Sequence, residues 1–396
     1  MAGKLIAEAE RLAGKLSQVR RRIHMHPELG YEEHRTADFV AETLRGIGLE
    51  VRTGVAKTGV VGLLKGARSG RTVAMRADMD ALPITEQNDV PYRSRVDGVM
   101  HACGHDGNTT AVLGAAMLLA RRRDEIAGNV KFIFQPSEES PPGGAAPMIA
   151  AGVLESPKVD VALGVHVDPS IDAGKIGVRD GPMMAAADDF RFAVLGEASH
   201  GAKPHLGVDA IVLSAQVVQA LQTIPSRRIN PTHPVVVTLG TIKGGYRRNV
   251  IADRVEVEGT ARTLDPKDRT EVERLIGTTV ALVTKAGGGR HEYSYERGYP
   301  VLVSDPAVTE LVREATCGEL GRRAVVEIAE PSMGGEDFAY FVNAVPGMMM
   351  RLGTRNKQKG FTHPWHHPKF DLDEKGLWVG AAVMARAALL YLERAR

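Results

Sequence analysis

The residues with the clearest potential for chemistry lie in the segment His-Ala-Cys-Gly-His-Asp at positions 101–106. Cys103 and His105 are two residues apart, so a thiolate and an imidazole can point at one cation, and zinc accepts both sulfur and nitrogen ligands. A Cys-x-His pair is weak support by itself, because a buried cysteine beside a hydrogen-bonded histidine is also common. A metal site therefore needs further ligands that converge on the same place.

Two adjacent carboxylates, Glu138 and Glu139, follow Gln135-Pro-Ser137 and an apolar stretch. In one interpretation a carboxylate coordinates a metal while its neighbour acts as a general base. A solvated turn explains the pair equally well. Carboxylates placed where a buried strand ends are, however, harder to dismiss than two on the surface of a helix.

Histidines supply the other candidate ligands. His166 ends an apolar stretch, where a lone histidine is more often a hydrogen-bonded core residue than a ligand. The segment 363–371 contains His363, His366 and His367. Such a cluster can be a surface accident, so by itself it decides little.

The elements that must position these residues follow from hydrophobic periodicity. Short apolar strands are predicted at 72–75, 130–134 and 159–165, and a helix at about 107–119 lies between the first two. This alternation indicates an α/β fold with an open, largely parallel sheet flanked by helices. Active sites in such sheets lie beyond the carboxyl ends of the strands. Asp78 and Asp80, the Glu138–Glu139 pair and His166 all follow strands, so we expect them to meet at one edge.

A second domain is indicated where the pattern changes near residue 188. Phe190, Phe192 and Val194 alternate with other residues, which is typical of a half-buried strand. The order that follows is strand, helix, strand, strand, helix, strand, as in the ferredoxin-like α+β motif. We therefore predict a discontinuous catalytic domain at 1–183 and 299–396, with a domain inserted at 184–298.

Composition narrows the functional classes. The chain has 396 residues and a formal net charge of +2, which favours neither nucleic acid nor an anionic membrane as a partner. The sequence has no uninterrupted apolar run of about 18 residues, so no membrane span is expected. Cys103 and Cys317 are the two cysteines, too few for a disulfide framework. The N-terminus carries charges where a signal peptide would be apolar, and a cytoplasmic location is expected.

Taken in order, these segments resemble the aminoacylase and carboxypeptidase superfamily of co-catalytic metal amidohydrolases. They look most like the branch of hippurate hydrolases, N-acetyldiaminopimelate deacetylases and indole-acetyl-amino-acid hydrolases. The resemblance spans nearly the whole chain, and so many ordered motifs are very unlikely to coincide by chance. The matching segments are His24–Gly30, Arg76–Pro83, His101–Asp106, Gln135–Glu139, Gly164–His166, Ser199–Gly201, Gly244–Val250, Gly334–Phe338 and His366–Glu374.

The resemblance implies a zinc-peptidase-like catalytic domain, an inserted lid or dimerisation domain, and two divalent metal ions per subunit. Glu138 would be the general base. His366 is preferred over His363 and His367 because it stands two residues before Pro368. The implied metal ligands are Cys103, His105, Glu139, His166 and His366.

Three further roles are implied. Asp78 resembles the aspartate that orients a metal ligand without binding the metal itself. His200 matches a histidine that reaches the scissile carbonyl oxygen, often across a dimer interface, and Asn249 matches a substrate-contacting position. A homodimer or higher homo-oligomer is therefore expected.

Two positions depart from the family pattern. Many relatives carry a second histidine where this chain has Asn108, and asparagine cannot replace an imidazole as a proton carrier. The Glu pair is followed by Ser140-Pro-Pro142 in place of a glycine-rich stretch, and proline stiffens a loop and removes backbone donors.

The function implied is hydrolysis of N-acyl or N-aroyl amino acids by a metal-bound hydroxide. Zn2+ suits the thiolate and imidazole ligands best, whereas Mn2+, Co2+ and Ni2+ are also compatible. One alternative is a dipeptidase or carboxypeptidase with the same metal centre. Another is a metal-binding homologue without catalytic activity, which the intact Glu138 argues against, because a buried carboxylate without a role is costly.

Overall fold

The computed structural model describes residues 5–394, which fold as two compact units with separate cores. Unit 1 extends to Gly181 and resumes over Val303–Ala329 and from Asp337 onward. Unit 2 comprises Pro182–Leu302 and Glu330–Glu336. The last of these segments clusters with unit 2, whereas the predicted boundaries assigned it to the larger domain.

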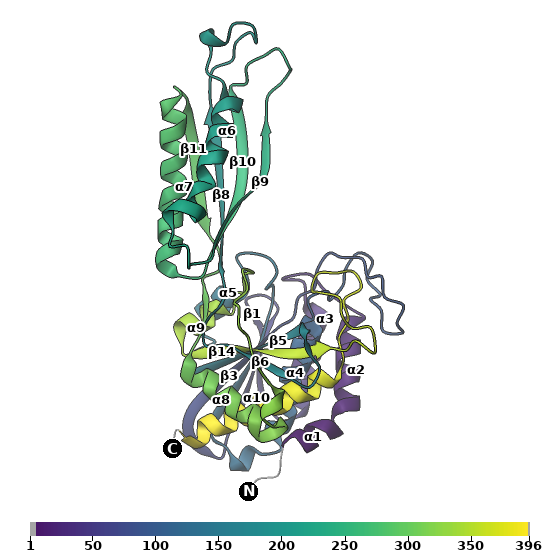
Figure 1. Ribbon diagram of the computed structural model, residues 1–396. Helices are drawn as coiled ribbons and strands as arrows, with labels where there is room; N and C mark the ends of the chain where they lie inside the picture. The colour runs from purple at the N-terminus through teal and green to yellow at the C-terminus, as the bar shows by residue number, and fades with distance from the viewer. Residues whose placement is uncertain (1–4, 395–396) are drawn as a thin grey trace. The chain divides into compact units, whose positions relative to one another are not determined.

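Within the described residues, unit 1 contains an eight-stranded sheet in the order β1-β2-β4-β3-β5-β14-β6-β13. Figure 1 labels strands β1, β3, β5, β14 and β6 of this sheet. The central strands β4, β3, β5 and β14 are mutually parallel, whereas β1, β2 and the β14–β6 pair are antiparallel. The predicted largely parallel sheet is confirmed. The strands are β1 (Glu50–Val55), β2 (Gly59–Lys65), β3 (Arg68–Asp78), β4 (Ala127–Gln135), β5 (Val161–Asp172), β6 (Ile176–Val178), β13 (Val325–Glu327) and β14 (Gly347–Arg355).

Helices flank this sheet, and the most deeply buried of them is α4. All of its residues except Ala120 at the end are buried, because it lies between the sheet and helices α2 and α10. Gly114 permits close packing, since a Cβ there would lie 2.8 Å from Ala381 of α10. The helices are α1 (Leu5–Arg11), α2 (Ala13–His24), α3 (His34–Gly46), α4 (His105–Ala120), α5 (Ala145–Ala150), α8 (Pro306–Leu320), α9 (Ala339–Ala344) and α10 (Lys375–Arg394).

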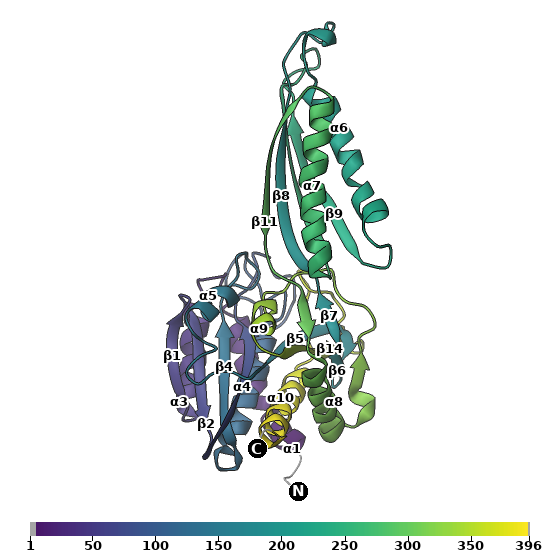
Figure 2. The ribbon, with the colours of Figure 1, turned by 90° about the vertical axis from the view of Figure 1, so that its left-hand side faces the viewer.

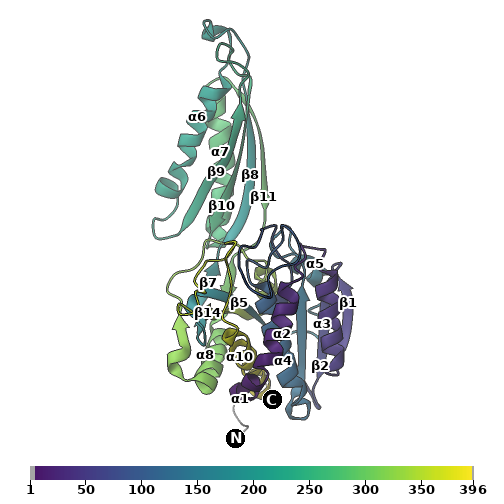
Figure 3. The same ribbon diagram turned by 90° about the vertical axis from the view of Figure 1, so that its right-hand side faces the viewer.

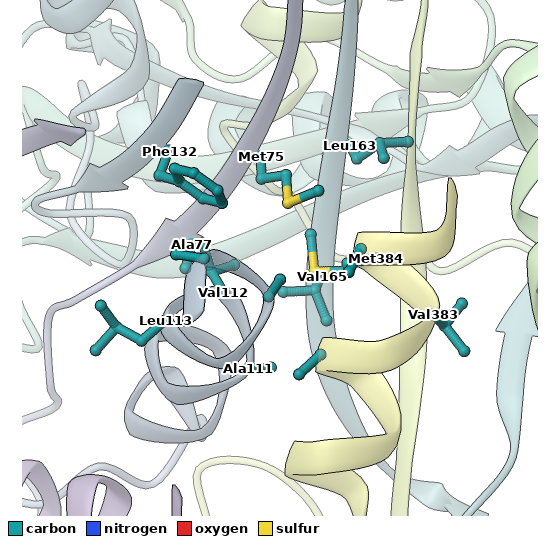
Figure 4. Packing of buried hydrophobic residues seen from close by; sticks show 14 of the residues in the cluster. Met75, Ala77, Ala111, Val112, Leu113, Phe132, Leu163, Val165, Val383 and Met384 are labelled. Carbon is teal, nitrogen blue, oxygen red and sulfur yellow. The ribbon is translucent and has the colours of Figure 1, made fainter. Parts of the chain in front are cut away.

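The core of unit 1 forms where apolar side chains of the central strands meet α4 and α10. Figure 4 shows Met75, Phe132 and Val165 from the strands gathered against Val112 and Met384 from the helices. All five are at most 1% exposed, and burial of each such side chain contributes about 1.5–3 kcal/mol. The strands that carry the candidate site are therefore anchored in this core.

Helix α10 is long and apolar enough to cross a membrane, and it is the one helix among residues 5–394 that meets both conditions. However, 72% of its apolar window is buried inside the protein, against α4, α8 and the sheet. The helix therefore behaves as the core helix of unit 1.

Unit 2 has the predicted ferredoxin-like topology. Its four antiparallel strands lie in the order β11-β8-β10-β9, and α6 and α7 pack side by side on one face (Figures 2 and 3). Asp209 and Asp265 cap these helices by accepting hydrogen bonds from the first turn. The elements are β8 (Ala186–Leu195), α6 (Ala210–Leu221), β9 (Val235–Gly244), β10 (Arg254–Thr263), α7 (Pro266–Ala286) and β11 (Arg290–Arg297), and a separate pair is formed by β7 (Gly181–Met184) and β12 (Leu302–Ser304).

Candidate metal centre

The candidate site lies at the carboxyl edge of the central strands of unit 1. Asp78 at the end of β3 pairs with Gln135 at the end of β4. Arg76 pairs with Gly164, two residues before His166 on β5. By this register, His166 on β5 lies level with the ends of β3 and β4, so the residues that follow β3 and β4 meet His166 at one edge of the sheet.

Cys103 and His105 reach this edge through the turn that begins α4. Gly104 between them has φ +90°, a backbone conformation that favours glycine. A Cβ at this position would lie 2.3 Å from Val167, so the turn and the close approach to β5 both require glycine. The turn buries both side chains and places Cys103 Sγ 3.5 Å from His166 Nε2.

His105 is held in place by Asp80. Its Nδ1 lies 2.9 Å from the Asp80 carbonyl oxygen and 3.1 Å from Asp80 Oδ1, so Nδ1 carries the hydrogen and donates it. His105 Nε2 is buried and has no hydrogen-bond partner among residues 5–394. Burial opposes a charge on this ring, but Asp78 and Cys103 raise the pKa of His105 well above its usual value. The surroundings of Nε2 therefore attract positive charge.

Glu138 and Glu139 lie on the loop after β4, and two backbone hydrogen bonds anchor this loop. The Ser137 N–H donates to Glu33 Oε1 over 2.8 Å, and the Glu139 N–H donates to Asp80 Oδ2 over 2.9 Å. Asp80 thus connects the Glu139 backbone with the His105 ring. Glu138 is buried, and Glu139 Oε1 is shielded from solvent and accepts no hydrogen bond within the described part of the chain.

The His166 ring is oriented by its own strand. Its Nδ1 donates to the Val167 carbonyl oxygen over 2.8 Å, which leaves Nε2 free to face Cys103. Burial and then the charge of Arg351 lower the pKa of His166 to about 3, so the ring is neutral, as a metal ligand must be. Trp365 lies edge-on to this ring and donates its Nε1–H to the same Val167 oxygen over 3.1 Å.

His366 approaches the site from the C-terminal segment. Its N–H donates to the Ala102 carbonyl oxygen over 2.9 Å, and its Nε2 lies 3.3 Å from Glu139 Oε1. The interaction with Glu139 raises the pKa of His366. His363 and His367 instead stack on each other with ring centroids 4.3 Å apart, and neither belongs to a ligand group within residues 5–394.

The donor set fits divalent cations. Thiolate, imidazole and carboxylate ligands suit zinc and other transition metals. Two buried atoms without hydrogen bonds, His105 Nε2 and Glu139 Oε1, are what a site that holds a cation would contain. Burial and then Glu139 raise the pKa of the Cys103 thiol well above its usual value, and a cation would stabilise the thiolate.

The ligand atoms gather in overlapping groups, within each of which all atoms lie within 4.8 Å of one another. Because Cys103 belongs to two of the groups, the residues fit a pair of divalent cations. All five implied ligands and Glu138 lie in unit 1. The three groups whose members all lie in unit 1 are Cys103–His105–His166, Cys103–Glu139–His366 and His105–Glu138–Glu139.

Asp78 and Asp80 make different contacts. Asp78 accepts hydrogen bonds from Arg76 Nη1 and Asn108 Nδ2, each over 2.7 Å, and its Oδ2 lies 3.8 Å from His105 Nε2. Burial favours the neutral carboxyl, but His105 and Arg76 lower the pKa of Asp78 to about 2. The carboxylate that hydrogen-bonds His105 is Asp80, for which the sequence predicted a place at the sheet edge but no role. The spacing in the sequence could have indicated this role, because Asp80 stands two residues after Asp78 and residues two apart in an extended segment point to the same side. The orienting role of Asp78 stays a prediction.

The two candidate residues of unit 2 lie on neighbouring segments. His200 pairs with Val250, and the Gly201 N–H donates to the Asn249 carbonyl oxygen over 2.9 Å. Both side chains are exposed. The Ala202 N–H donates to His200 Nδ1 over 3.0 Å, so the ring hydrogen resides on Nε2, which is free to donate. Their roles in catalysis and substrate binding stay predictions.

The chain resembles proteins of established families. Residues 74–390 match the model of peptidase family M20/M25/M40. A thermostable carboxypeptidase of Saccharolobus solfataricus is 41% identical over 98% of both chains. An N-acyl-L-amino acid amidohydrolase of Geobacillus stearothermophilus is 45% identical over 72% of this chain and 77% of its own.

Solved structures agree with this assignment. The crystal structure of a dinuclear metal binding peptidase from the M20 family of Bacillus subtilis superposes with a TM-score of 0.85 at 36% identity, and covers 97% of this chain and 99% of that one. Its dinuclear centre is consistent with the ligand groups found here. The chain therefore belongs to peptidase family M20/M25/M40 and is a metal-dependent amidohydrolase.

Proposed function

We propose that this amidohydrolase cleaves the amide bond of N-acyl or N-aroyl amino acids and that Glu138 is its general base. The observation that carries the proposal is the placement of the Glu pair. Glu139 shares ligand groups with Cys103, His105 and His366, and Glu138 is buried in the group that also holds His105 and Glu139. A buried carboxylate next to metal ligands is positioned to accept a proton at the reacting centre.

The proposed mechanism gives each of these residues a separate role. When bound, divalent cations at such a site polarise a carbonyl and lower the pKa of water. Glu138 takes a proton from the attacking water and then delivers it to the leaving amine nitrogen. The free Nε2–H of His200 donates to the carbonyl oxygen as negative charge develops there, and Asn249 contacts the substrate.

Three relatives bear on the substrate class. The N-acyl-L-amino acid amidohydrolase supports an acylated amino acid, as does an N-acetyl-L-cysteine deacetylase of Bacillus subtilis, 39% identical over 92% of this chain and 85% of its own. The carboxypeptidase relative supports the second candidate, a peptidase that uses the same metal centre. The two candidates differ in whether the substrate carries an acyl group or a free amine.

The test is a panel of N-acetyl, N-benzoyl and longer N-acyl amino acids beside dipeptides with a free amine. Amine release is measured for metal-reconstituted wild type and for Glu138→Gln, which keeps the size of the side chain. We expect wild type to prefer acylated substrates. The glutamine variant should bind the same amount of metal but lose about 10²- to 10⁴-fold in kcat, since its amide cannot accept the proton.

Two outcomes would contradict the proposal. Near-wild-type kcat in Glu138→Gln would exclude Glu138 as the base. Release from dipeptides alone would favour the peptidase. Glu139→Gln is the matched control, because loss of a ligand should lower metal affinity as well as rate.

The native metals and the location of the protein are also part of the proposal. Thiolate and imidazole ligands favour Zn2+, with Mn2+, Co2+ and Ni2+ as compatible ions, and reconstitution with each would rank them by activity. Cys103 and Cys317 are free thiols, which supports a reducing compartment such as the cytoplasm.

We also propose that the protein is a homodimer. Unit 2 offers the support, because β9 is an edge strand of its sheet and exposes Ile242, while Ile211 and Val212 of α6 and Tyr246 are at least half exposed. Edge strands and apolar patches are typical of interaction surfaces. Light scattering gives the mass in solution, and a mass of one chain would contradict the dimer.

A further inference from the structure

Asn108 makes two hydrogen bonds that connect separate parts of the metal centre. It lies in the first turn of α4, three residues after His105, and is completely buried. Its Nδ2 donates to Asp78 Oδ1 over 2.7 Å, and its Oδ1 accepts from the Val167 N–H over 2.8 Å. The orientation of the amide is determined by chemistry, because a backbone N–H can only donate and an ionised carboxylate can only accept.

The bond to Val167 lies where strand pairing ends. The register of β3 with β5 extends only as far as Arg76 opposite Gly164. Beyond Gly164, β5 continues to Asp172, so backbone groups on that side need other partners. The side chain of Asn108 supplies one for Val167.

Val167 in turn controls the His166 ring. Its carbonyl oxygen accepts from His166 Nδ1 over 2.8 Å and from Trp365 Nε1 over 3.1 Å. The hydrogen bond to Nδ1 determines both the tautomer and the direction of His166 Nε2, which faces Cys103. Movement of the Val167 backbone, whose N–H bonds to Asn108 and whose carbonyl oxygen bonds to His166, would therefore rotate the ring out of the ligand group.

We propose that Asn108 is a positioning residue for the metal centre, which holds His166 as a ligand through Val167 while it anchors Asp78. This inference rests on the proposed metal site. It gives a role to Asn108, which stands where many relatives carry a histidine. The amide suits this role because it presents one donor and one acceptor at a fixed separation. A proton carrier is not needed for it.

Asn108→Leu tests the proposal, because it keeps the number and branching of the side-chain heavy atoms and removes both hydrogen bonds. The readouts are the affinity for Co2+, measured by competition with a chelator, and the absorption spectrum of the cobalt protein. We expect Co2+ affinity to fall about 10- to 100-fold and the spectrum to change, as for other residues that orient metal ligands. Thr110→Val is the matched control, since Thr110 is equally buried in α4 and its hydroxyl bonds only to the Asp106 carbonyl.

The outcomes separate positioning from general stability. If Asn108→Leu binds Co2+ like wild type with an unchanged spectrum, the proposal is wrong, even if its Tm is lower. Asn108→Ser, whose hydroxyl is too short to replace the amide, should change the cobalt spectrum in the same direction. If the leucine variant does not fold, a serine variant with an unchanged spectrum would contradict the proposal. Neither readout needs a substrate, so failure of every acylated amino acid to react would contradict the proposed function and leave this test intact.

Discussion

At the scale of single residues, one carboxylate organises two of the proposed ligands. Asp80 Oδ1 contacts His105 Nδ1, and Asp80 Oδ2 accepts from the Glu139 N–H. Both oxygens are used, so Asp80 couples the start of α4 to the loop after β4. A carboxylate that orients a ligand imidazole also makes it a better electron donor to a metal.

Asp80→Asn is expected to weaken metal binding without large effects on folding. The amide keeps the size of the side chain but presents an NH2 group to one of two donors, so either His105 loses one of its two acceptors or the Glu139 backbone loses its acceptor. We expect a loss of about 10- to 100-fold in metal affinity and in kcat/KM. Asp89→Asn, at an exposed position in the same unit, is the control, and equal behaviour of the two variants would contradict the role given to Asp80.

At the scale of elements, a buried ion network fastens α2 to α4 and to the C-terminal segment. Arg20 pairs with Asp106 over 2.7 Å and with Asp371 over 2.9 Å, and His24 Nδ1 lies 2.7 Å from Asp106. Burial favours a neutral carboxyl, but Arg20 and His24 hold the pKa of Asp106 well below its usual range. The stabilisation is therefore complete above the ordinary aspartate pKa of about 3.9 and is lost as the pH falls through the lower folded-state pKa.

Arg20 and Arg21 form a matched pair for a stability test. Arg20 is fully buried, whereas the Arg21 side chain is 44% exposed and pairs with Glu374. Arg20→Leu leaves Asp106 and Asp371 buried without their cation and should lower the free energy of unfolding by about 3–5 kcal/mol. Arg21→Leu should cost less than about 1 kcal/mol. Denaturant titration at pH 7 measures the free energy of unfolding of both variants. Similar losses in the two variants would show that the buried network contributes no more to stability than the exposed pair.

At the scale of the whole molecule, metal binding should act on one unit. All the proposed ligands belong to unit 1, as do Trp365 and Trp378, the two tryptophans of the chain. Unit 2 has a separate apolar core built from its sheet and from α6 and α7. Tryptophan fluorescence therefore reports the unfolding of unit 1 alone, and circular dichroism reports both units.

Removal of metal by a chelator should lower the midpoint of thermal unfolding that tryptophan fluorescence reports. A ligand at 100 times its Kd stabilises the folded state by about 2.7 kcal/mol, so the shift should amount to several degrees in Tm. Hydrogen exchange of α7 in unit 2 should stay the same. A fluorescence midpoint that does not respond to chelation, or an equal change in the exchange of α7, would contradict the placement of the metals.

The predictable parts of the fold are those with strong periodicity. The helix predicted at 107–119 is α4, and the strands predicted at 72–75 and 130–134 are the central parts of β3 and β4. Strands β1 and β2 were not predicted. Strand β1 is mostly exposed, and Gly59 and Gly62 weaken the pattern of β2. Pairing with β1 on one side and with β4 on the other makes β2 a strand, and Leu44 approaches Gly62 closely.

The sequence by itself determined the architecture of the two parts of the chain, the family and the candidate ligand types, because these depend on local periodicity and on short ordered motifs. It could not decide which of His363, His366 and His367 joins the ligands without the resemblance, nor that Asp80 and Asn108 hold them. Those facts depend on which atoms from distant segments come within hydrogen-bond distance. The packing of α4 against β5 and the end of β3 brings Asp78, Asn108 and Val167 together, and the C-terminal segment brings His366 to Glu139.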